Sequence, residues 1–355
     1  MSDEALHFDE AINPYGCSPR AVEAMVAFAR SQEYRFYGVE ATGESLRADL
    51  ALHFGLSPDN FVVYNGAGEA VAWIYIARLL LQRGTLITPY PSYERFTEGA
   101  KIFTDRVIEI PLTPEDWSLP VDQMIEEGRR RQATIGLISN PNNPGGNLLV
   151  DATTLDALLD GLPDCLWIID EAFADYTGVT FVPWVAERRN LVVLRTFSKA
   201  YGLAGLRVGY AAAHVAVAEQ LARFRIPWGV DSMALVAARA ALADQVYLQE
   251  VVARIHADCR AFQAAIVRVP HFVPRPGKAN FFLVRLDEID PARVNAHLTS
   301  HGVRVRTRTP WEVRWAFTRA GPIPSRRTRK KLACPGRGTK CGTRTIAAWN
   351  ARQSA

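Results

Sequence analysis

The sequence has no apolar run long enough to cross a membrane. Among its 355 residues the longest approach is Val71 to Leu81, which Arg78 interrupts, whereas a spanning helix needs about 20 apolar residues. The amino terminus reads MSDEALHFDE and lacks the basic-then-apolar order of a signal peptide. We therefore expect no membrane anchor, and a composition that is 48% hydrophobic and 22% charged is typical of a soluble globular protein.

Cysteine is also scarce, with five residues that are widely spaced and form no CxxC pair. They are Cys17, Cys165, Cys259, Cys334 and Cys341. An odd and scattered set argues against a disulfide scaffold and against a zinc site of the usual ligand spacing. This cysteine usage is typical of a reducing compartment, so we predict a cytoplasmic protein without a bound metal.

Acidic residues are missing from the carboxyl-terminal region. Residues 313–355 hold 11 Lys or Arg and no Asp or Glu, so residues 1–312 keep 30 basic and 37 acidic side chains. The tail has many Gly, Arg and Thr and little periodicity, which is typical of disorder, of a disrupted reading frame or of a nucleic-acid-binding arm. Nucleic-acid binding is the least favoured of these, because Trp349 is the only aromatic residue beyond residue 320.

The middle of the chain contains a regular alternation of apolar and amphipathic segments. Seven apolar runs have the pattern of strands: 61–64, 85–88, 106–110, 134–138, 166–169, 191–195 and 208–212. Amphipathic segments typical of helices lie between several of them: 69–81, 92–102, 152–162 and 215–224. This alternation predicts an α/β fold, in which helices cover both faces of a mostly parallel seven-stranded sheet.

After about residue 245 the pattern changes, which predicts a second domain. A long helix (245–267) is followed by a strand (281–286), a helix (291–301) and a strand (303–306), as in a smaller α+β domain. The expected organisation has four parts: an arm and helix at 1–35 that pack with the small domain, a large domain at 36–245, the small domain at 246–318, and the tail at 319–355.

Chemistry-bearing residues follow the predicted strands, whose carboxyl ends hold the ligand in a parallel sheet. The glycine-rich turn at 65–69 opens a helix, and free N–H groups there can bind an anion. Asp170 ends a wholly apolar strand, where a buried carboxylate needs a cationic or proton-donating partner. Lys199 is the lone amine of TFSKAYGLAGLRVGY. Taken singly, these are also consistent with an ordinary turn, a helix N-cap and a solvated lysine. Together they are what pyridoxal phosphate requires.

At these motifs the chain resembles the fold-type I pyridoxal-phosphate enzymes of the aminotransferase class I/II superfamily. Within it, the chain is most similar to the histidinol-phosphate aminotransferase and threonine-phosphate decarboxylase group. The motifs follow the family order from residue 13 to about residue 306: Asn13-Pro14-Tyr15-Gly16, RFYGVEATGESLR around Tyr37, Gly66-Ala67-Gly68-Glu69, Asn140-Pro141-Asn142-Asn143-Pro144-Gly145, Asp170-Glu171-Ala172-Phe173 and Ser198-Lys199-x-x-x-Leu203-Ala204-Gly205-Leu206-Arg207.

The resemblance implies a role for each of these cofactor-site residues. Lys199 would hold the cofactor as a Schiff base and then move the proton at the substrate Cα. Asp170 would keep the ring nitrogen protonated, Asn143 would bind the ring oxygen, and Tyr93 would stack on the ring unless it is a plain core aromatic. The phosphate would be held by Gly66, Ala67, Thr196, Ser198 and Arg207. Tyr37 would reach the phosphate of a neighbouring subunit, which implies a homodimer with shared active sites.

The expected substrate is a small amino-acid-like molecule, which the resemblance places against Tyr15, Asn143, Arg306 and Arg314. Two departures from the family pattern leave the reaction open. Phe173 stands where many aminotransferases have a tyrosine, and the basic tail replaces the closing helix after Arg314, so that this arginine is equally an accidental match. The sequence predicts an aminotransferase. The alternatives are a decarboxylase of the threonine-phosphate type and a catalytically impaired cofactor-binding relative.

Overall fold

The computed structural model describes residues 6–37, 43–309 and 312–316, with side chains described up to residue 306. The chain divides into a larger unit, residues 16–253 with 277–279, and a smaller unit from residues 1–15, 254–276 and 280–355. The predicted tail at 319–355 lies outside the described residues. No helix in the described part of the chain is long and apolar enough to cross a membrane.

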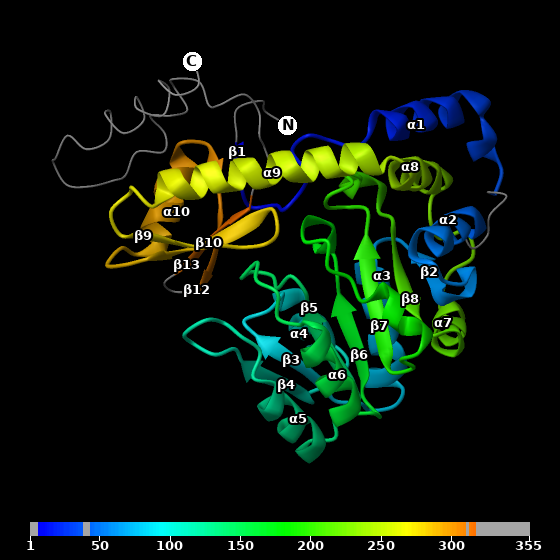
Figure 1. Cartoon of the computed structure of the whole chain (residues 1–355), viewed down its shortest axis with the longest axis horizontal. Coiled ribbons are helices and arrows are strands. Elements are labelled where there is room, and N and C mark those ends of the chain that lie inside the picture. Colours follow the sequence, from blue (N-terminus) through cyan, green and yellow to red (C-terminus); the bar gives the residue numbers. More distant parts are fainter. Residues whose placement is uncertain (1–5, 38–42, 310–311, 317–355) are drawn as a thin grey trace. The chain divides into compact units, whose positions relative to one another are not determined.

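The larger unit contains a seven-stranded sheet with the strand order β2-β8-β7-β6-β5-β3-β4 (Figure 1). Its strands are β2 (Phe61–Tyr64), β3 (Leu86–Tyr90), β4 (Val107–Pro111), β5 (Ile135–Ser139), β6 (Leu166–Asp170), β7 (Leu191–Thr196) and β8 (Gly209–Ala213). Strand β8 runs antiparallel to β2 and β7, and the other neighbouring pairs of this sheet are parallel. The predicted mostly parallel seven-stranded α/β sheet is therefore confirmed, and each strand overlaps a predicted apolar run.

Helices of the larger unit surround this sheet. They are α1 (Pro19–Ser31), α2 (Glu44–Phe54), α3 (Ala67–Tyr75), α4 (Glu94–Lys101), α5 (Val121–Arg130), α6 (Ala152–Gly161), α7 (Val215–Ala222) and α8 (Ser232–Ala243). The predicted helix at 69–81 begins earlier and ends as a π-helical segment, Ile76–Leu80. Helix α1 belongs to the larger unit and contacts α8, whereas the sequence analysis expected it to pack with the small domain. Ala21 is the one buried residue of α1.

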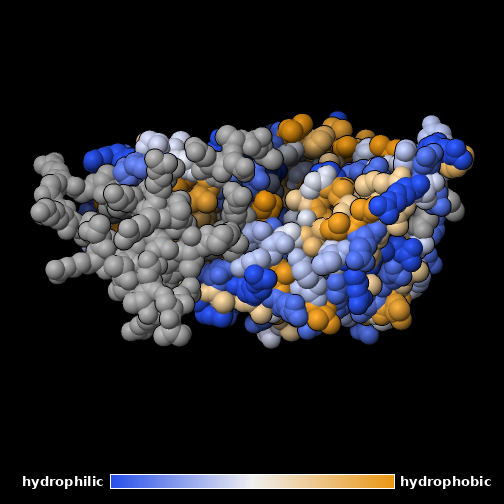
Figure 2. Space-filling view, turned by 90° about the horizontal axis from the view of Figure 1, so that it is seen from above, coloured by the Kyte–Doolittle hydropathy of each residue, from blue (hydrophilic) through white to orange (hydrophobic). Residues whose placement is uncertain are grey.

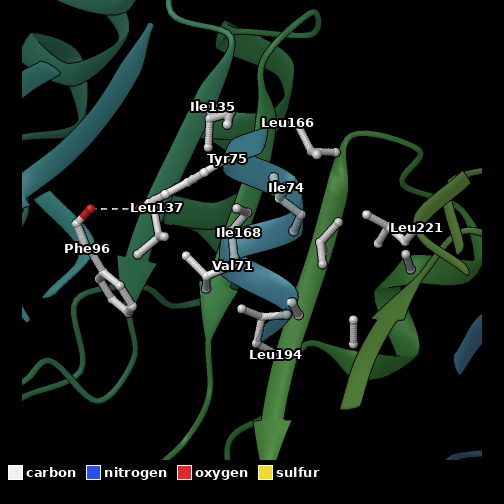
Figure 3. Packing of buried hydrophobic residues seen from close by; sticks show 14 of the residues in the cluster. Val71, Ile74, Tyr75, Phe96, Ile135, Leu137, Leu166, Ile168, Leu194 and Leu221 are labelled. Atoms are coloured by element: carbon white, nitrogen blue, oxygen red, sulfur yellow. Dashed lines mark hydrogen bonds between the residues drawn. The ribbon is translucent and has the colours of Figure 1, made fainter. Parts of the chain in front are cut away.

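The hydrophobic core lies between one face of the sheet and the helices that cover it. Alternate strand residues, such as Ile135 with Leu137, point to the same face because side chains alternate along a strand. From α3, Val71 and Ile74 pack against them (Figure 3). The hydroxyl of Tyr75 donates to the Phe96 carbonyl at 3.0 Å, so the one polar atom of this ring is satisfied inside the core. A rigid packed sheet of this kind holds its strand ends in fixed positions.

The smaller unit combines helices with an antiparallel sheet, as the predicted α+β composition requires. The four-stranded sheet has the order β12-β13-β10-β9, and a separate parallel pair joins β1 to β11. The strands are β1 (Leu6–His7), β9 (Phe272–Arg275), β10 (Phe281–Leu286), β11 (Val303–Arg304), β12 (Arg306–Thr309) and β13 (Glu312–Ala316). Helix α10 (Pro291–Ser300) begins at the N-cap Asp290, and helix α9 (Gln245–Ile266) runs from the larger unit into the smaller one.

Candidate active site

Three adjacent parallel strands end at one edge of the larger sheet and bring the predicted acid close to the predicted lysine. The register pairs Ser139 at the end of β5 with Asp170 at the end of β6, and Asp170 with Leu194 in β7. Lys199 follows three residues after β7 ends. The carboxyl ends of parallel strands are where α/β proteins bind ligands. The sheet topology therefore places this acid and this amine at a ligand-binding edge.

Asp170 is buried, with 8% of the residue exposed. Burial raises the pKa of its carboxyl to about 6, while the Ala172 N–H, the charge of Lys199 and the Ser139 hydroxyl act in the opposite direction. The Ala172 N–H donates to Asp170 Oδ1 at 3.2 Å, and the Asn140 N–H donates to the Asp170 carbonyl at 2.9 Å. A buried carboxylate with so few donors is well suited to a ligand that brings a proton or a positive charge.

Lys199 lies in the loop that follows β7 and is partly buried. Its Nζ lies 5.2 Å from the centroid of the Phe173 ring, in a cation–π arrangement. Phe173 itself is buried after β6. The phenylalanine that departs from the common family pattern is therefore a neighbour of the lysine, and its ring contributes an apolar surface where a tyrosine would add a hydroxyl.

A glycine turn and an arginine meet beside this lysine. Gly66 caps helix α3 with φ +84°, a backbone conformation that only glycine adopts readily. A Cβ on Gly66 would lie 2.6 Å from Nη2 of Arg207, so the guanidinium sits directly against the turn. Arg207 is itself left-handed (φ +55°), and its Nη1 donates to Ser198 Oγ at 3.3 Å. The start of a helix and a guanidinium together form a strong anion site.

Two hydroxyls complete this anion site. The side chain of Thr196 donates to Ser198 Oγ at 3.0 Å, and both residues are buried. A Cβ on Gly209 would lie 2.9 Å from the Ala67 N, so the first residue of β8 lies close to the start of α3. The structure thus brings together all five residues that the sequence predicted around the phosphate.

These residues fit pyridoxal phosphate. The phosphate needs several donors and positive charge, which the turn, the hydroxyls and Arg207 offer. The ring nitrogen needs an acid, and Asp170 is a buried carboxyl whose pKa burial raises to about 6. The amine of Lys199 lies within the same set of strand ends. The donor-rich anion site, the Lys199 amine and the Asp170 carboxyl therefore match the phosphate, the carbonyl group and the ring nitrogen of this cofactor.

The loop after β5 is tied down by one side chain. Asn140 accepts the N–H groups of Leu149 and Val150 at 2.8 and 3.1 Å through Oδ1, and its Nδ2 donates to the Val150 carbonyl at 3.0 Å. Asn143, which lies inside this loop, is buried. The other predicted ring contact, Tyr93, is partly buried before α4 and packs edge-on against Phe96 at 5.2 Å. Tyr93 thus also packs on the core cluster.

The remaining predicted site residues come from both units. Tyr37 belongs to the larger unit and is 86% exposed, with its ring 5.5 Å from that of Trp228. Tyr15, Arg306 and Arg314 belong to the smaller unit. Arg314 is opposite Arg306 in the β12–β13 pair, but its side chain lies outside the described ones. The strand position predicted for Arg314 is present.

In the smaller unit, Tyr15 has partners of its own. Its hydroxyl donates to Asp258 Oδ2 at 2.5 Å, and the guanidinium of Arg254 lies over its ring at 4.0 Å. Burial, followed by the hydrogen bond to Asp258, raises the pKa of the Tyr15 hydroxyl to about 12. Tyr15 is therefore a neutral hydrogen-bond donor at any physiological pH.

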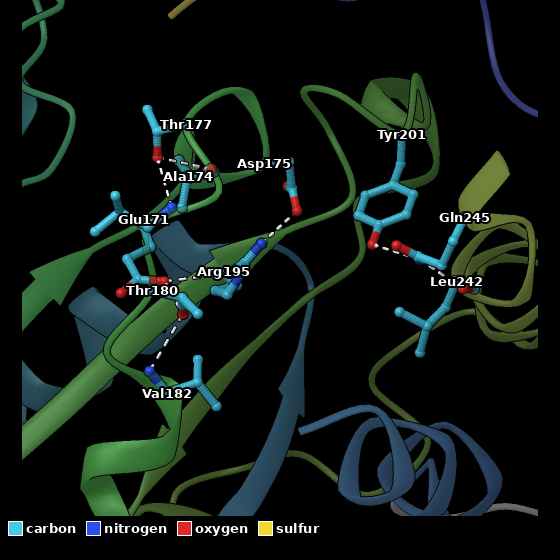
Figure 4. Close-up of polar contacts among 12 residues, drawn as sticks. Glu171, Ala174, Asp175, Thr177, Thr180, Val182, Arg195, Tyr201, Leu242 and Gln245 are labelled. Atoms are coloured by element: carbon cyan, nitrogen blue, oxygen red, sulfur yellow. Dashed lines mark hydrogen bonds and ion pairs between the residues drawn. The ribbon is translucent and has the colours of Figure 1, made fainter. Parts of the chain in front are cut away.

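A buried ionic network, which was not predicted from the sequence, lies behind the strand ends. Arg195 in β7 pairs with Glu171 (Nη1–Oε2 3.2 Å) and with Asp175, and the three side chains point toward one another (Figure 4). Burial raises the pKa of the Glu171 carboxyl to about 7, and the charge of Arg195 acts in the opposite direction. The one signal in the sequence was a single arginine at the end of the otherwise apolar run 191–195, which calls for buried carboxylate partners.

Comparison with known proteins agrees with this site. The family model "Aminotransferase class I and II" matches residues 4–329. The chain is 35% identical over 310 residues to histidinol-phosphate aminotransferase of Roseiflexus castenholzii, covering 86% of this chain and 82% of that protein. It is 34% identical over 308 residues to the chloroplastic histidinol-phosphate aminotransferase of Nicotiana plumbaginifolia, covering 86% and 72%.

Solved structures show the same fold. Histidinol-phosphate aminotransferase from Sinorhizobium meliloti, in complex with pyridoxal-5'-phosphate, superimposes with a TM-score of 0.80 at 24% identity, covering 88% of this chain and 86% of that one. L-threonine-O-3-phosphate decarboxylase from Porphyromonas gingivalis gives 0.75 at 25% identity, covering 89% and 95%. The chain therefore belongs to the aminotransferase class I and II family of pyridoxal-phosphate-dependent enzymes, as its motifs predicted.

Proposed function

We propose that this protein transfers an amino group between an amino-alcohol phosphate of the histidinol-phosphate type and a 2-oxo acid. The observation that carries the proposal is the meeting of Asp170, Lys199 and the Gly66–Arg207 anion site at one edge of the sheet. The named activity of the relatives that are 34–35% identical supports this substrate class.

The residues at the sheet edge have two roles, which are cofactor binding and proton transfer. When bound, pyridoxal phosphate supplies an electron-withdrawing ring that stabilises negative charge at the substrate Cα. Lys199 would hold the cofactor and, as a neutral amine, would act as the base and acid that moves the proton at the substrate Cα. Asp170 keeps the ring nitrogen protonated, because a carboxylate in this dry position gains most from a charged partner.

The remaining larger-unit residues orient the cofactor. Gly66, Ala67, Thr196, Ser198 and Arg207 hold its phosphate through backbone N–H groups, hydroxyls and a guanidinium. Asn143 binds the ring oxygen and Tyr93 covers the ring face.

On the substrate side, Tyr15 would accept a hydrogen bond, because its one hydroxyl proton is donated to Asp258, and Arg306 and Arg314 would bind anionic groups of the substrates. These three assignments rest on the family motifs.

We also propose a homodimer, in which Tyr37 completes the anion site of the partner subunit. Exposed apolar and aromatic residues of the larger unit favour such an interface: Val22, Val26, Tyr34, Phe36, Tyr37, Ile226 and Trp228. Apolar side chains lie among charged ones on the described part of the face shown in Figure 2. A cytoplasmic location is consistent with the three described cysteines, Cys17, Cys165 and Cys259, which are free thiols.

An amino-transfer assay tests the proposal. Purified protein is incubated with pyridoxal phosphate, 2-oxoglutarate and either histidinol phosphate or histidinol, and glutamate formation is followed. We expect glutamate with histidinol phosphate and much less with histidinol, because the dephosphorylated donor loses its anionic handle. Release of carbon dioxide from an amino-acid phosphate, without glutamate, would favour the decarboxylase alternative that Phe173 leaves open.

A further inference from the structure

The buried network of Glu171, Asp175 and Arg195 is more elaborate than the stability of the sheet requires. The side chains of Arg195, Asp175 and Glu171 are 9%, 8% and 1% exposed, so two carboxylates and one guanidinium are removed from water. Burying such groups costs free energy that their attraction barely repays, and apolar residues of similar size would stabilise the sheet as well. What a guanidinium that binds two carboxylates does provide is fixed geometry.

Two members of the network are next to residues of the proposed site. Glu171 follows Asp170, and Arg195 precedes Thr196. Because adjacent strand residues point to opposite faces, the network lies behind the residues that face the cofactor. The Glu171 N–H donates to the Leu194 carbonyl at 2.8 Å, which joins the ends of β6 and β7 immediately behind the acid.

The network also fixes the loop that carries Phe173. Glu171 accepts the Phe181 N–H at 2.6 Å on Oε1 and the Thr180 hydroxyl at 2.6 Å on Oε2, which closes a ten-residue loop onto its own start. Asp175, in the middle of this loop, binds Arg195. The ring beside the Lys199 amine is therefore fastened at both ends of its loop and in the middle.

We propose that Glu171, Asp175 and Arg195 are positioning residues, which hold the Asp170 carboxylate, the Phe173 ring and the β7 end that leads to Lys199 in register for the reaction. This inference rests on the proposed function, because it concerns the alignment of the same site. None of the three side chains is assigned a contact with cofactor or substrate. Their effect is transmitted through the backbone of the adjacent residues.

The experiment compares two arginines that each bind two carboxylates. Arg195→Lys keeps the charge but loses the fork, since an ammonium is a single point of contact. The matched control is Arg188→Lys. Arg188 pairs with Asp160 at 2.8 Å and with Asp156, but it lies before the first residue of β7, at the opposite end of the strand from the site. Thermal midpoint, kcat, KM and the circular dichroism of the bound cofactor are measured for both holoenzymes.

For Arg195→Lys we expect a fall in kcat of about tenfold or more with KM changed less than about threefold, because misalignment affects the reaction more than binding. The cofactor dichroism should also change, since it reports the orientation of the ring in the site. Arg188→Lys should show a comparable or smaller loss of thermal midpoint with wild-type kcat and dichroism. If Arg195→Lys kept both wild-type values, or if both variants changed alike, the positioning role would be overturned.

A second variant covers the case in which Arg195→Lys does not fold. Glu171→Gln keeps the shape of the side chain, and we expect the same loss of kcat and the same change in dichroism. In the apo protein, hydrogen exchange should quicken in residues 171–181 and stay unchanged in β5. Unchanged exchange with unchanged kcat would overturn the inference. A wild-type protein that shows no cofactor dichroism would instead refute the proposed function, and this inference with it.

Discussion

At the scale of single residues, the site depends on a pair of neighbouring carboxylates with different surroundings. Asp170 and Glu171 are consecutive and both are buried, yet Glu171 forms an ion pair with Arg195 and accepts two further hydrogen bonds, while Asp170 accepts the Ala172 N–H and has the Ser139 hydroxyl and the Lys199 charge near it. Burial raises the pKa of both carboxyls, to about 6 and about 7. The Glu171 carboxylate is satisfied by the protein, whereas that of Asp170 depends on what binds in front of it.

Asp170→Asn tests this difference through stability. A carboxyl whose folded pKa is raised stabilises the protein below its unfolded value near 4 and loses that contribution as pH rises through about 6. The apo variant should therefore be more stable than the apo wild type at pH 8, by about 1–3 kcal/mol, and no more stable at pH 4. Denaturant unfolding at the two pH values measures this. If the variant and the wild type differed equally in unfolding free energy at pH 4 and at pH 8, burial of the Asp170 charge would not be the cause of the difference.

The same substitution should reduce activity while the cofactor stays bound. An amide cannot keep the ring nitrogen protonated, so we expect kcat to fall about a hundredfold or more, which is about 3 kcal/mol in the barrier. Steady-state kinetics with saturating pyridoxal phosphate measure the loss. Normal turnover would reduce Asp170 to a capping residue that accepts the Ala172 N–H.

Lys199 carries the covalent chemistry in this account. Borohydride treatment of the holoenzyme should add one pyridoxyl group to the tryptic peptide that contains Lys199, as read by mass spectrometry. Lys199→Ala should lose the adduct and lower kcat by about 10²- to 10⁴-fold, the usual contribution of a positioned acid–base group. A variant that retained more than a small fraction of wild-type turnover would rule out the assignment.

At the scale of elements, the anion site depends on the first turn of α3. Gly66 adopts φ +84°, and a side chain there would strike the Arg207 guanidinium. Gly68, two residues later in the helix, has no positive φ, and a Cβ added there would meet no atom within 4 Å. The two glycines therefore differ in whether an added side chain would displace the Arg207 guanidinium.

Gly66→Ala and Gly68→Ala form a matched pair. Gly66→Ala should raise the Kd for pyridoxal phosphate by about tenfold or more, because strain and the displaced guanidinium together cost about 1–2 kcal/mol. Gly68→Ala should leave the Kd unchanged and stabilise the helix by up to about 1 kcal/mol. Fluorescence titration of the apo proteins gives both constants. Equal effects would mean that the turn does not contact the cofactor.

The strands were predictable from the sequence because burial of a strand on both faces requires a continuous apolar run, which is a local feature of the sequence. Strands buried on both faces are continuous apolar runs, and all seven runs became strands of the sheet. Helices α2, α5 and α8 were not predicted from the sequence. Helix α5 is amphipathic but only 10 residues long, with Met124 and Gly128 buried, whereas α8 is so rich in alanine that its faces hardly differ.

The site was predictable only where a motif carried it. Asp170, Lys199 and the Gly66 turn are contiguous in family motifs, and their proximity follows from the strand order. The network of Arg195 with Asp175 spans 20 residues and depends on how one loop closes. Such pairing leaves no periodic trace in the sequence, so the arginine could be seen but its partners could not.

At the scale of the whole molecule, shared active sites make a prediction about mixtures. Tyr37→Ala and Lys199→Ala should each lower activity strongly as pure proteins. After subunits of both are mixed and reassorted, half of the dimers should be hybrids, each with one intact site, so that about a quarter of wild-type activity returns. An activity assay before and after mixing measures this. No recovery, despite proven hybrid formation, would mean that Tyr37 and Lys199 of the same subunit serve one site, and the shared-site proposal would be wrong.

A single-turnover experiment tests whether this chain moves an amino group from a phosphorylated amino donor onto its cofactor. Holoenzyme is mixed with excess histidinol phosphate in the absence of any 2-oxo acid, and the products are quantified by mass spectrometry. The account predicts one pyridoxamine phosphate and one molecule of the oxo product per site in the wild type, and neither in Lys199→Ala. Unchanged pyridoxal phosphate on a wild-type protein with bound donor would contradict it.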